Sequence, residues 1–522
     1  MMSSDLPFRD GLWVVDFEYQ ATKGDEPYVL CVVALELRSG RQIKLWRDEL
    51  GPLPPFPTDE HALFIAYSAT AEASCCLSLG WPTPTHVLDL LVEFRLHTNG
   101  RWEPAYDDKG KRIAENLLAA LAHFGLPSMG STFKNAMRDL ILNHEGNWSE
   151  TEKQHVLEYC SADVEATAKL FFAMQPHLDR DLRRSLLRGA FMPAASRIER
   201  HGIPIDVETL RRLATNWDAL RLKIVQAKDK NRIYDGLVWK MDRWAAKIAS
   251  EGKAWPLTKS GHLALDKKTF KDRAMVYPDV EEYRQLRKTI SELRLADLVI
   301  GKDGRNRAYL FPFRTKTGRN APSPSEQIFG GPKWLRSLIK PSEGRGVALI
   351  DWRAQEIGIV AALSGDKAMM EAYRSGDIYL ALAKATGAVP QDATKAHPMR
   401  DVFKTVMLGT NYGMGAETLA ERIGKPASVA RDLLRQYKES YPVFARWGDA
   451  VENFAIWRGN LWTALGWRQY FDDDADKRLN VRAARNFLAQ GNGAEMMRIA
   501  ALLGLERGVT ICTPIHDLHT DP

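Results

Sequence analysis

The stretch GVALIDWRAQEIGIVAALSGD, residues 346–366, decides how the larger part of the chain is interpreted. Its first part is apolar and rich in β-branched residues, which predicts a strand over 346–352, and the following residues predict a helix over 353–364. Asp351 lies at the carboxyl end of the strand, where its carboxylate would be exposed and rigidly held, as a metal ligand must be. Glu356 lies in the first turns of the helix.

A second stretch repeats a four-residue step, with Arg400, Lys404, Leu408 and Tyr412. Each step advances a helix by about 40° beyond a full turn, so the four side chains form one slanted stripe on a helix predicted over 397–412. Arginine and lysine on one helical face can bind a triphosphate, and the tyrosine at the far end can pack against a base pair. An ordinary amphipathic helix is the alternative, but it does not require this order and spacing.

The third stretch is TPIHDLHTDP, residues 513–522. We expect an apolar strand to deliver His516 and Asp517, as the strand over 346–352 delivers Asp351. A strand that ended at Asp517 would leave a sheet edge exposed, so we expect the natural chain to continue with another strand and a helix.

Taken in order, these stretches resemble motifs A, B and C of DNA polymerase family A. The resemblance implies that Asp351 and Asp517 hold two Mg²⁺ ions, for which Mn²⁺ can substitute. It implies that Arg400 and Lys404 bind the triphosphate of a dNTP, and that Glu356 blocks a ribose 2′-OH. Residues 352–355, Leu408 and Leu518 depart from the family pattern, which usually has an aromatic residue and an acidic residue at the last two positions.

Shorter matches follow the same family. Thr317-Gly318-Arg319 resembles the Thr-Gly-Arg whose arginine contacts the primer end, and Tyr379 stands where the family has a histidine near the phosphates. The segment RIERHGIPID, residues 197–206, resembles the opening of the polymerase domain. The resemblance implies dNTP contacts for Tyr379, Leu408 and Tyr412 and DNA contacts for Arg319, Arg482, Asn486, Gln490 and His516.

The first part of the chain has a different pattern. Strands are predicted over 12–20, 27–37 and 41–46, and helices near 112–124 and 151–175. The second of these helices begins with a Ser-x-x-Glu capping signal. An α/β domain that ends near residue 180 is expected. Beyond it, a further strand is predicted over 309–315 and further helices over 416–424, 427–438 and 480–505.

Carboxylates recur in this first part. Asp16 and Glu18 alternate on a strand and therefore share one face, where hard oxygen ligands suit Mg²⁺ or Mn²⁺. Tyr159 and Asp163 are four residues apart on a helix and share a face as well. An Asp-x-Glu pair alone is weak evidence for a metal site.

With Glu72, these residues resemble the three motifs of proofreading DnaQ-like exonucleases. The resemblance implies that Tyr159 orients the attacking water and that two metal ions are held by Asp16, Glu18, Glu72 and Asp163. Ser68 and Glu72 depart from the asparagine and aspartate that are usual in the second motif. An inactive exonuclease fold kept as a scaffold is the alternative.

Composition limits the class of protein. The chain has 522 residues, 45% hydrophobic and 26% charged, with neither a bilayer-spanning apolar run nor a signal peptide. Its five cysteines have no zinc-type spacing, and we interpret them as reduced cytosolic thiols. Residues 1–180 carry 16 Lys and Arg against 26 Asp and Glu, whereas residues 181–522 carry 56 against 40. The basic part suggests a polyanionic partner, with a solvated basic surface as the alternative.

We therefore expect an α+β protein with an RNase H-like 3′→5′ exonuclease domain over 1–180. A right-hand polymerase domain would follow over 181–522, with the thumb at about 206–300, the fingers at about 365–440 and an incomplete C-terminal end of the palm. The expected function is template-directed DNA synthesis with proofreading, by a cytoplasmic monomer that binds primer-template DNA, dNTPs and replisome accessory proteins but no membrane. The alternatives are an exonuclease with an inactive, DNA-binding polymerase half, and a non-catalytic replisome protein.

Overall fold

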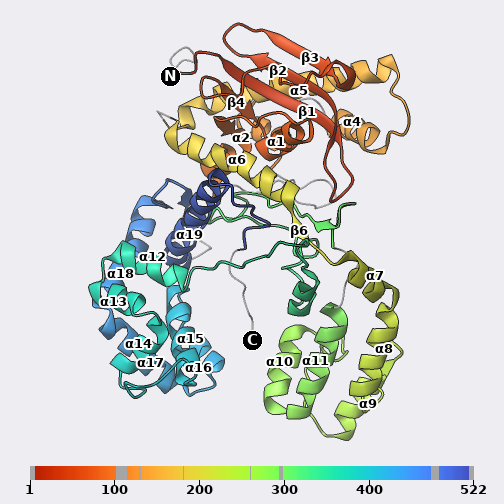
Figure 1. Cartoon of the computed structure of the whole chain (residues 1–522). Coiled ribbons are helices and arrows are strands. Elements are labelled where there is room, and N and C mark those ends of the chain that lie inside the picture. Colours follow the sequence, from red (N-terminus) through yellow and green to blue (C-terminus); the bar gives the residue numbers. More distant parts are fainter. Residues whose placement is uncertain are drawn as a thin grey trace.

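A computed structural model of the chain places a sheet-containing N-terminal half above two largely helical groups (Figure 1). It describes residues 6–101, 115–127, 131–179, 182–258, 260–292, 298–471 and 481–515. The α+β content agrees with the expected fold class. Within the described part of the chain, no helix is both long and apolar enough to span a bilayer.

One five-stranded sheet organises the N-terminal half. The strand pairs β1–β2 and β2–β3 are antiparallel, whereas β1–β4 and β4–β5 are parallel. Runs such as VLCVV are buried along their whole length because helices cover both faces of the sheet. The three strands predicted from sequence are formed. In spatial order the strands are β3 (Gln42–Trp46), β2 (Tyr28–Glu36), β1 (Leu12–Gln20), β4 (Leu63–Ala66) and β5 (Val87–Asp89).

Helices α1 and α5 contact the strands of this sheet. The predicted capping box opens α5: the Ser149 amide donates to the Glu152 carboxylate at 2.8 Å, and Ser149 Oγ accepts from the Glu152 amide at 3.3 Å. The helix predicted near 112–124 is formed over Leu117–His123, and residues 112–114 lie outside the described part of the chain. The helices of this half are α1 (Ala69–Ser78), α2 (Leu90–Thr98), α3 (Leu117–His123), α4 (Ser131–Asn143) and α5 (Glu150–Met174).

Helix α6 (Arg183–His201) joins the two halves. It packs against α1 and β5 above and against α19 below, so both halves share it. At Gly189 a Cβ atom would lie only 1.8 Å from the carbonyl oxygen of Val87, so α6 rests directly on the backbone of β5. Downstream, the short antiparallel pair β6 (Ile203–Pro204) and β9 (Arg305–Asn306) follows α6.

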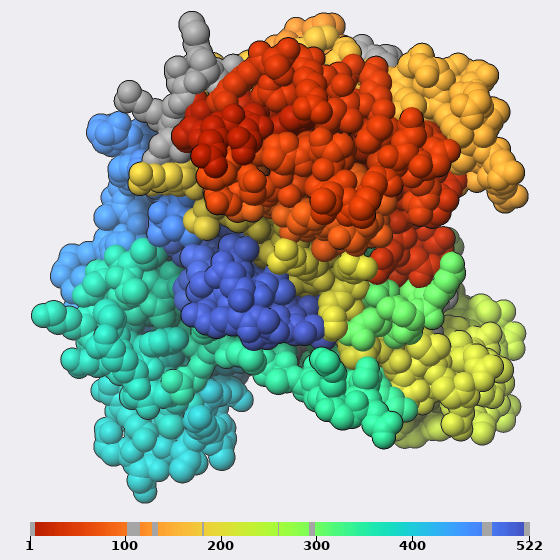
Figure 2. Space-filling model, turned by 45° about the horizontal axis from the view of Figure 1, so that its top comes forward, coloured from red at the N-terminus to blue at the C-terminus, as the bar shows by residue number. Residues whose placement is uncertain are grey.

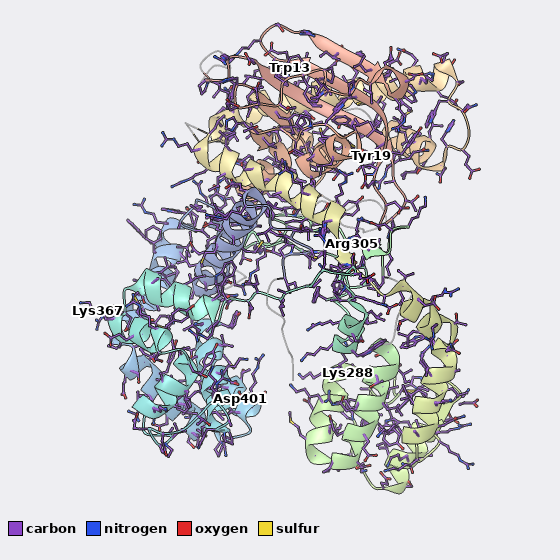
Figure 3. The ribbon with its side chains drawn as sticks, viewed as in Figure 1. Trp13, Tyr19, Lys288, Arg305, Lys367 and Asp401 are labelled. Carbon is purple, nitrogen blue, oxygen red and sulfur yellow. The ribbon has the colours of Figure 1, made fainter. Side chains whose placement is uncertain are left out.

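The helical group on the right of Figure 1 has its own small core around Trp244, Phe270 and Tyr283. Lys288 of α11 belongs to this group, while Lys367 of α13 and Asp401 of α15 belong to the group on the left (Figure 3). The right-hand elements are α7 (Val207–Thr215), α8 (Trp217–Lys228), β7 (Tyr234–Asp235), β8 (Val238–Trp239), α9 (Met241–Ser250), α10 (Lys267–Val276) and α11 (Pro278–Glu292).

The left-hand group contains the helix of the Arg400 stripe, α15, and the long helix α19. Each of the helices predicted in this part from 353 onward is formed, with ends shifted by a few residues. The elements are α12 (Gln355–Ser364), α13 (Lys367–Arg374), α14 (Ile378–Ala385), α15 (Met399–Asn411), α16 (Ala416–Ile423), α17 (Ala427–Ser440), α18 (Pro442–Arg458), β10 (Asn460–Trp462), β11 (Arg468–Tyr470) and α19 (Val481–Glu506).

One apolar cluster runs through both halves. It joins Trp13 and Phe17 of β1 to Phe191 of α6 and to Trp467 and Phe487 of the left-hand helical group. Figure 2 shows the blue C-terminal helix and the yellow α6 directly beneath the red and orange N-terminal half. The halves are therefore packed together through a continuous core.

Two predicted strands are wrong. Residues 309–315 and 346–352 form no strand. Phe311 and Phe313 have positive φ angles of 46° and 56°, which interrupt an extended chain. Residues 346–352 are extended but have no strand beside them in the described chain, so no ladder of hydrogen bonds forms.

Candidate active sites

Asp16 and Glu18 lie on one face of β1 and come together with Cys160 of α5. Ligand atoms of these three residues lie within 4.8 Å of one another, and Cys160 Sγ is 3.3 Å from Asp16 Oδ2. Strand β4 pairs with β1 only as far as Val14, so the strands are no longer paired where the carboxylates begin. There the Phe17 amide donates to Glu72 Oε2 at 3.1 Å, which fixes the buried Glu72 at the same end of β1.

The two motif residues of α5 lie beside this group, with Asp163 close enough to repel the Asp16 carboxylate. The Tyr159 hydroxyl is hydrogen-bonded to Asp163, one turn away on the same helix. Asp163 Oδ1 also lies 2.7 Å from Nζ of Lys134, a residue of α4. No local pattern connects Lys134 with the carboxylate motifs, because the contact depends on how α4 packs against α5. The ligand and water-orienting roles assigned to these residues stay predictions.

Burial controls the charge of this cluster. Desolvation, followed by repulsion from Asp163, raises the pKa of Asp16 to about 7. Desolvation and neighbouring carboxylates also raise the pKa values of Glu18 and Glu72 well above their usual range. Hard divalent cations would favour the ionised forms, so the chemistry of these donors fits Mg²⁺ or Mn²⁺.

The second motif contains a strained turn. Ser68 has a φ angle of 77°, a left-handed conformation that asparagine adopts more readily than serine. The buried Asp89 carboxylate accepts the Ala69 amide at 2.8 Å and the Leu91 and Val92 amides at 2.9 and 3.1 Å. Asp89 therefore supports this turn and caps α2, which is a structural role.

In the polymerase-like half, Glu356 joins three distant segments. Its buried carboxylate accepts a hydrogen bond from Arg319 Nη2 at 2.7 Å and from the Tyr412 hydroxyl at 2.6 Å. Tyr412 also bonds Gln490 of α19, and burial beside Glu356 raises its pKa well above the usual range. Four of the predicted dNTP- and DNA-binding residues thus meet at one point.

Arg400 begins the stripe on α15. Its Nε lies 2.6 Å from Asp377 Oδ2, and its guanidinium lies 5.5 Å from the Tyr379 ring centroid. Asp377 also accepts the Leu380 amide at 3.1 Å as the N-cap of α14, a contact that sequence reasoning missed. The sequence signal for this N-cap was an aspartate directly before a run of helix-forming residues. Further along the stripe, Lys404 is exposed and Leu408 half-buried.

The remaining predicted residues are exposed or half-buried, or lie outside the described part of the chain. Asp351 is exposed on the extended segment before α12, and it is not at the end of a strand as predicted. Asn486 is half-buried on α19. His516, Asp517 and the side chain of Arg482 lie outside the described part of the structure.

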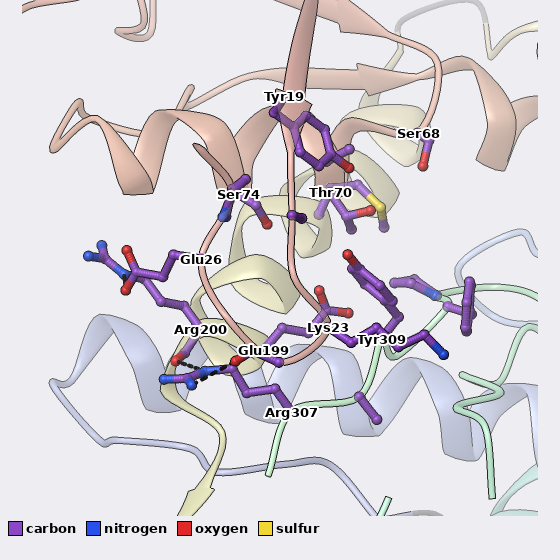
Figure 4. A pocket seen from close by; sticks show the side chains of 18 of the residues that line it. Tyr19, Lys23, Glu26, Ser68, Thr70, Ser74, Glu199, Arg200, Arg307 and Tyr309 are labelled. Carbon is purple, nitrogen blue, oxygen red and sulfur yellow. Dashed lines mark hydrogen bonds and ion pairs between the residues drawn. The ribbon is translucent and has the colours of Figure 1, made fainter. Parts of the chain in front are cut away.

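A cavity of about 550 Å³ lies between the two halves and is lined by residues of both. Tyr19 of β1 and Tyr309 point toward one another across it, with Ser68 and Thr70 nearby (Figure 4). Arg138, one helical turn beyond Lys134 on α4, also lines it. Ion pairs between the halves lie at its rim, such as Lys23–Glu326 at 2.7 Å.

The family described as DNA polymerase family A matches residues 245–515. The DNA polymerase of Mycobacterium phage D29 is 27% identical, over 78% of this chain and 69% of the phage protein. DNA polymerase I of Chloroflexus aurantiacus is 27% identical, over 69% of this chain but only 41% of the relative. A solved structure of the polymerase domain of Pol1 from M. smegmatis, in complex with a DNA primer-template and dNTP, shares the fold with a TM-score of 0.68 at 17% identity, over 95% of this chain and 86% of that one. The matched segment covers more than half of the chain and contains the Arg319, Glu356 and Tyr412 assembly, and the chain therefore belongs to DNA polymerase family A.

Proposed function

We propose that this protein extends a DNA primer from dNTPs, as directed by a template. The match of residues 245–515 to DNA polymerase family A carries this proposal. The assembly of Glu356 with Arg319 and Tyr412 supports it, since it links the predicted sugar-excluding residue to predicted primer- and base-contacting residues. The chain spans less than half of the bacterial relative from Chloroflexus. The polymerase activity of this chain is therefore a proposal, which rests on the family match and on the Glu356 assembly together.

The residues of this half would act by binding and exclusion. Arg400 and Lys404 bind the triphosphate and neutralise its charge as the helix closes over a matched pair. Asp377 holds the Arg400 guanidinium through their ion pair at the start of α14. Glu356 stands where a ribose 2′-OH would come, and Tyr412 packs against the new base pair. Base pairing selects the nucleotide, so the protein reads shape and backbone.

Asp351, together with Asp517, would hold the divalent cations. Mg²⁺ held there would supply a Lewis acid for the primer 3′-OH and positive charge for the pyrophosphate leaving group. An exposed carboxylate at Asp351 fits this role, because it stays accessible to a cation and to the primer end.

We further propose 3′→5′ exonuclease proofreading by the N-terminal half. The convergence of Asp16, Glu18, Glu72 and Asp163 beside Tyr159 supports it. Bound divalent cations would activate a water for attack on the terminal phosphodiester. The cavity between the halves, with Tyr19 and Tyr309 on its walls, is large enough for an unpaired nucleotide leaving the polymerase half.

Primer extension tests the first activity, with a labelled primer on a longer template, all four dNTPs and Mg²⁺. Templated products are expected, and the nucleotide incorporated at each position should be the complement of the template base. A 3′-labelled single strand without dNTPs tests the second activity, by release of the terminal nucleotide. Extension without 3′ degradation would leave the polymerase proposal standing and remove the exonuclease proposal. Degradation alone would favour an exonuclease whose polymerase half only binds DNA.

A further inference from the structure

Lys134 belongs to none of the three exonuclease motifs, yet its side chain reaches the carboxylate cluster. Its Nζ lies 2.7 Å from Asp163 Oδ1 and 5.9 Å from the centroid of the Tyr159 ring. Both partners of the ion pair are largely buried, with 16% of the Lys134 side chain and 13% of the Asp163 side chain exposed. A lysine with so little contact with water needs a carboxylate partner, so its placement depends on the cluster.

The position of α4 brings Lys134 to this point. Gln20 Nε2 at the end of β1 donates to the carbonyl oxygens of Ile141 and His144, at 2.8 and 3.0 Å. These bonds tie the C-terminal turn of α4 and the residue that follows it to the strand that carries Asp16 and Glu18. Lys134 is therefore held against the cluster by contacts that involve no motif residue.

The charges of the cluster are unbalanced without Lys134. Four carboxylates converge there, and Lys134 is placed to interact with both Asp163 and Asp16. Asp163 is bonded on one side to the Tyr159 hydroxyl and on the other to the Lys134 ammonium. These two contacts restrict the orientation of the Asp163 carboxylate.

We propose that Lys134 is a positioning residue of the exonuclease site, which fixes Asp163 and Tyr159 and offsets part of the negative charge that binds the metal ions. This inference rests on the proposed exonuclease function. Lys134 touches neither the substrate nor the water; it acts through Asp163. Its removal has two opposite effects. The divalent cation is bound more tightly, because the repulsion between an ammonium and a nearby dication outweighs the cost of a freer carboxylate. Cleavage is slower, because Asp163 and Tyr159 lose their fixed orientation.

The test compares Lys134→Met with the unmodified full-length chain in two measurements. Calorimetric titration with Mn²⁺, in the absence of DNA, reports the affinity of the cluster without any catalysis. The double variant Asp16→Ala/Glu18→Ala identifies which part of the heat belongs to this site. Release of a 3′-terminal nucleotide from a single strand then gives kcat and KM separately.

For Lys134→Met we expect Mn²⁺ to bind roughly fivefold more tightly. We expect kcat for 3′ release to fall at least about tenfold, with KM within about twofold of the original value. Lys134→Arg keeps the charge and should recover most of both quantities. Lys153→Met, which breaks an exposed ion pair with Glu150 on α5, is the matched control and should change neither.

Unchanged Mn²⁺ affinity together with unchanged kcat in Lys134→Met would overturn the proposal, as would weaker Mn²⁺ binding. A fall in kcat that Lys134→Arg does not recover would also overturn it, since the ion pair would then be irrelevant. If the unmodified protein released no 3′ nucleotide, the exonuclease function itself would fail. The Mn²⁺ titration would still decide whether Lys134 sets the affinity of the cluster.

Discussion

The two candidate sites of this chain differ in how completely they are formed. In the N-terminal half, Asp16, Glu18, Glu72 and Asp163 converge on buried elements, with Glu72 only 3% exposed. In the polymerase-like half, Asp351 lies on an extended segment whose neighbour Ile350 is 91% exposed. Of the two carboxylates predicted to hold metal in this half, Asp351 alone lies in the described part of the chain, and no strand lies beside its segment there.

The difference shows what a motif needs in order to become a site. Asp16 and Glu18 are carried by a strand, β1, that pairs with β2 along most of its length and with β4 as far as Val14, and that α1 and α5 cover. The segment before Asp351 has the sequence of a strand but no partner for its backbone groups in the described chain. Strand propensity alone does not form a strand, because its hydrogen bonds come from a neighbour.

The largest effect should come from removing the formed site. Asp16→Ala with Glu18→Ala deletes two carboxylates from one face of β1, so 3′ release from a labelled single strand should fall below about one-thousandth of its original rate. Primer extension should stay near normal. If the variant lost primer extension while its circular dichroism spectrum matched that of the unmodified protein, the two activities would not depend on separate sites.

Asp351→Asn tests whether Asp351 holds a cation for primer extension. The amide keeps the size of the side chain but loses the charge that holds a cation, and extension should fall by about a thousandfold. Release of 3′ nucleotides should persist. Asp351 is exposed, so the melting temperature should hardly change, and full activity would exclude Asp351 as a ligand.

Glu356→Ala tests the assembled part of the polymerase-like half. Shortening this side chain opens the space for a 2′-OH, and the ratio of ribonucleotide to deoxynucleotide incorporation should rise roughly 10- to 100-fold. Glu356→Gln keeps the size of the side chain and should keep most of the discrimination. Equal ratios for alanine and glutamate would remove Glu356 from this role.

Glu199 offers a smaller, pH-dependent effect at the boundary between the two sites. Burial raises the pKa of this cavity-lining carboxyl to about 7, although it accepts the Leu310 amide at 2.6 Å. Below its unfolded pKa the group is protonated in both states. As the pH rises toward 7 only the unfolded state ionises freely, so stability is lost.

Glu199→Gln should therefore raise the free energy of unfolding by roughly 1 to 3 kcal/mol at pH 8 and leave it nearly unchanged near pH 4.5. Denaturant titrations of both proteins at the two pH values measure this. A difference that is the same at both pH values would mean that the side chain stays ionised in the folded protein.

Local signals account for most of what could be predicted from the sequence. The strands β1 to β3, the capping box of α5 and the helices α12, α15, α16, α17 and α19 follow from periodicity and caps, whereas α18 was not predicted. Lys134 and Asp377 were missed because their partners, Asp163 and Arg400, lie on other elements. Contacts between side chains on different elements depend on tertiary packing, which a local sequence pattern does not encode.

Helix α6 has a consequence for how this protein can be divided. Its residues Phe191, Met192 and Ile198 lie in a core that contains side chains of both halves, and Gly189 leaves no space between α6 and β5. Deleting residues 1–180 would expose the apolar face of α6 to solvent and leave a fragment that is prone to aggregate. Removal of the N-terminal carboxylates is therefore better achieved by point substitution than by truncation, and any recombination that exchanges one half must bring a matching α6.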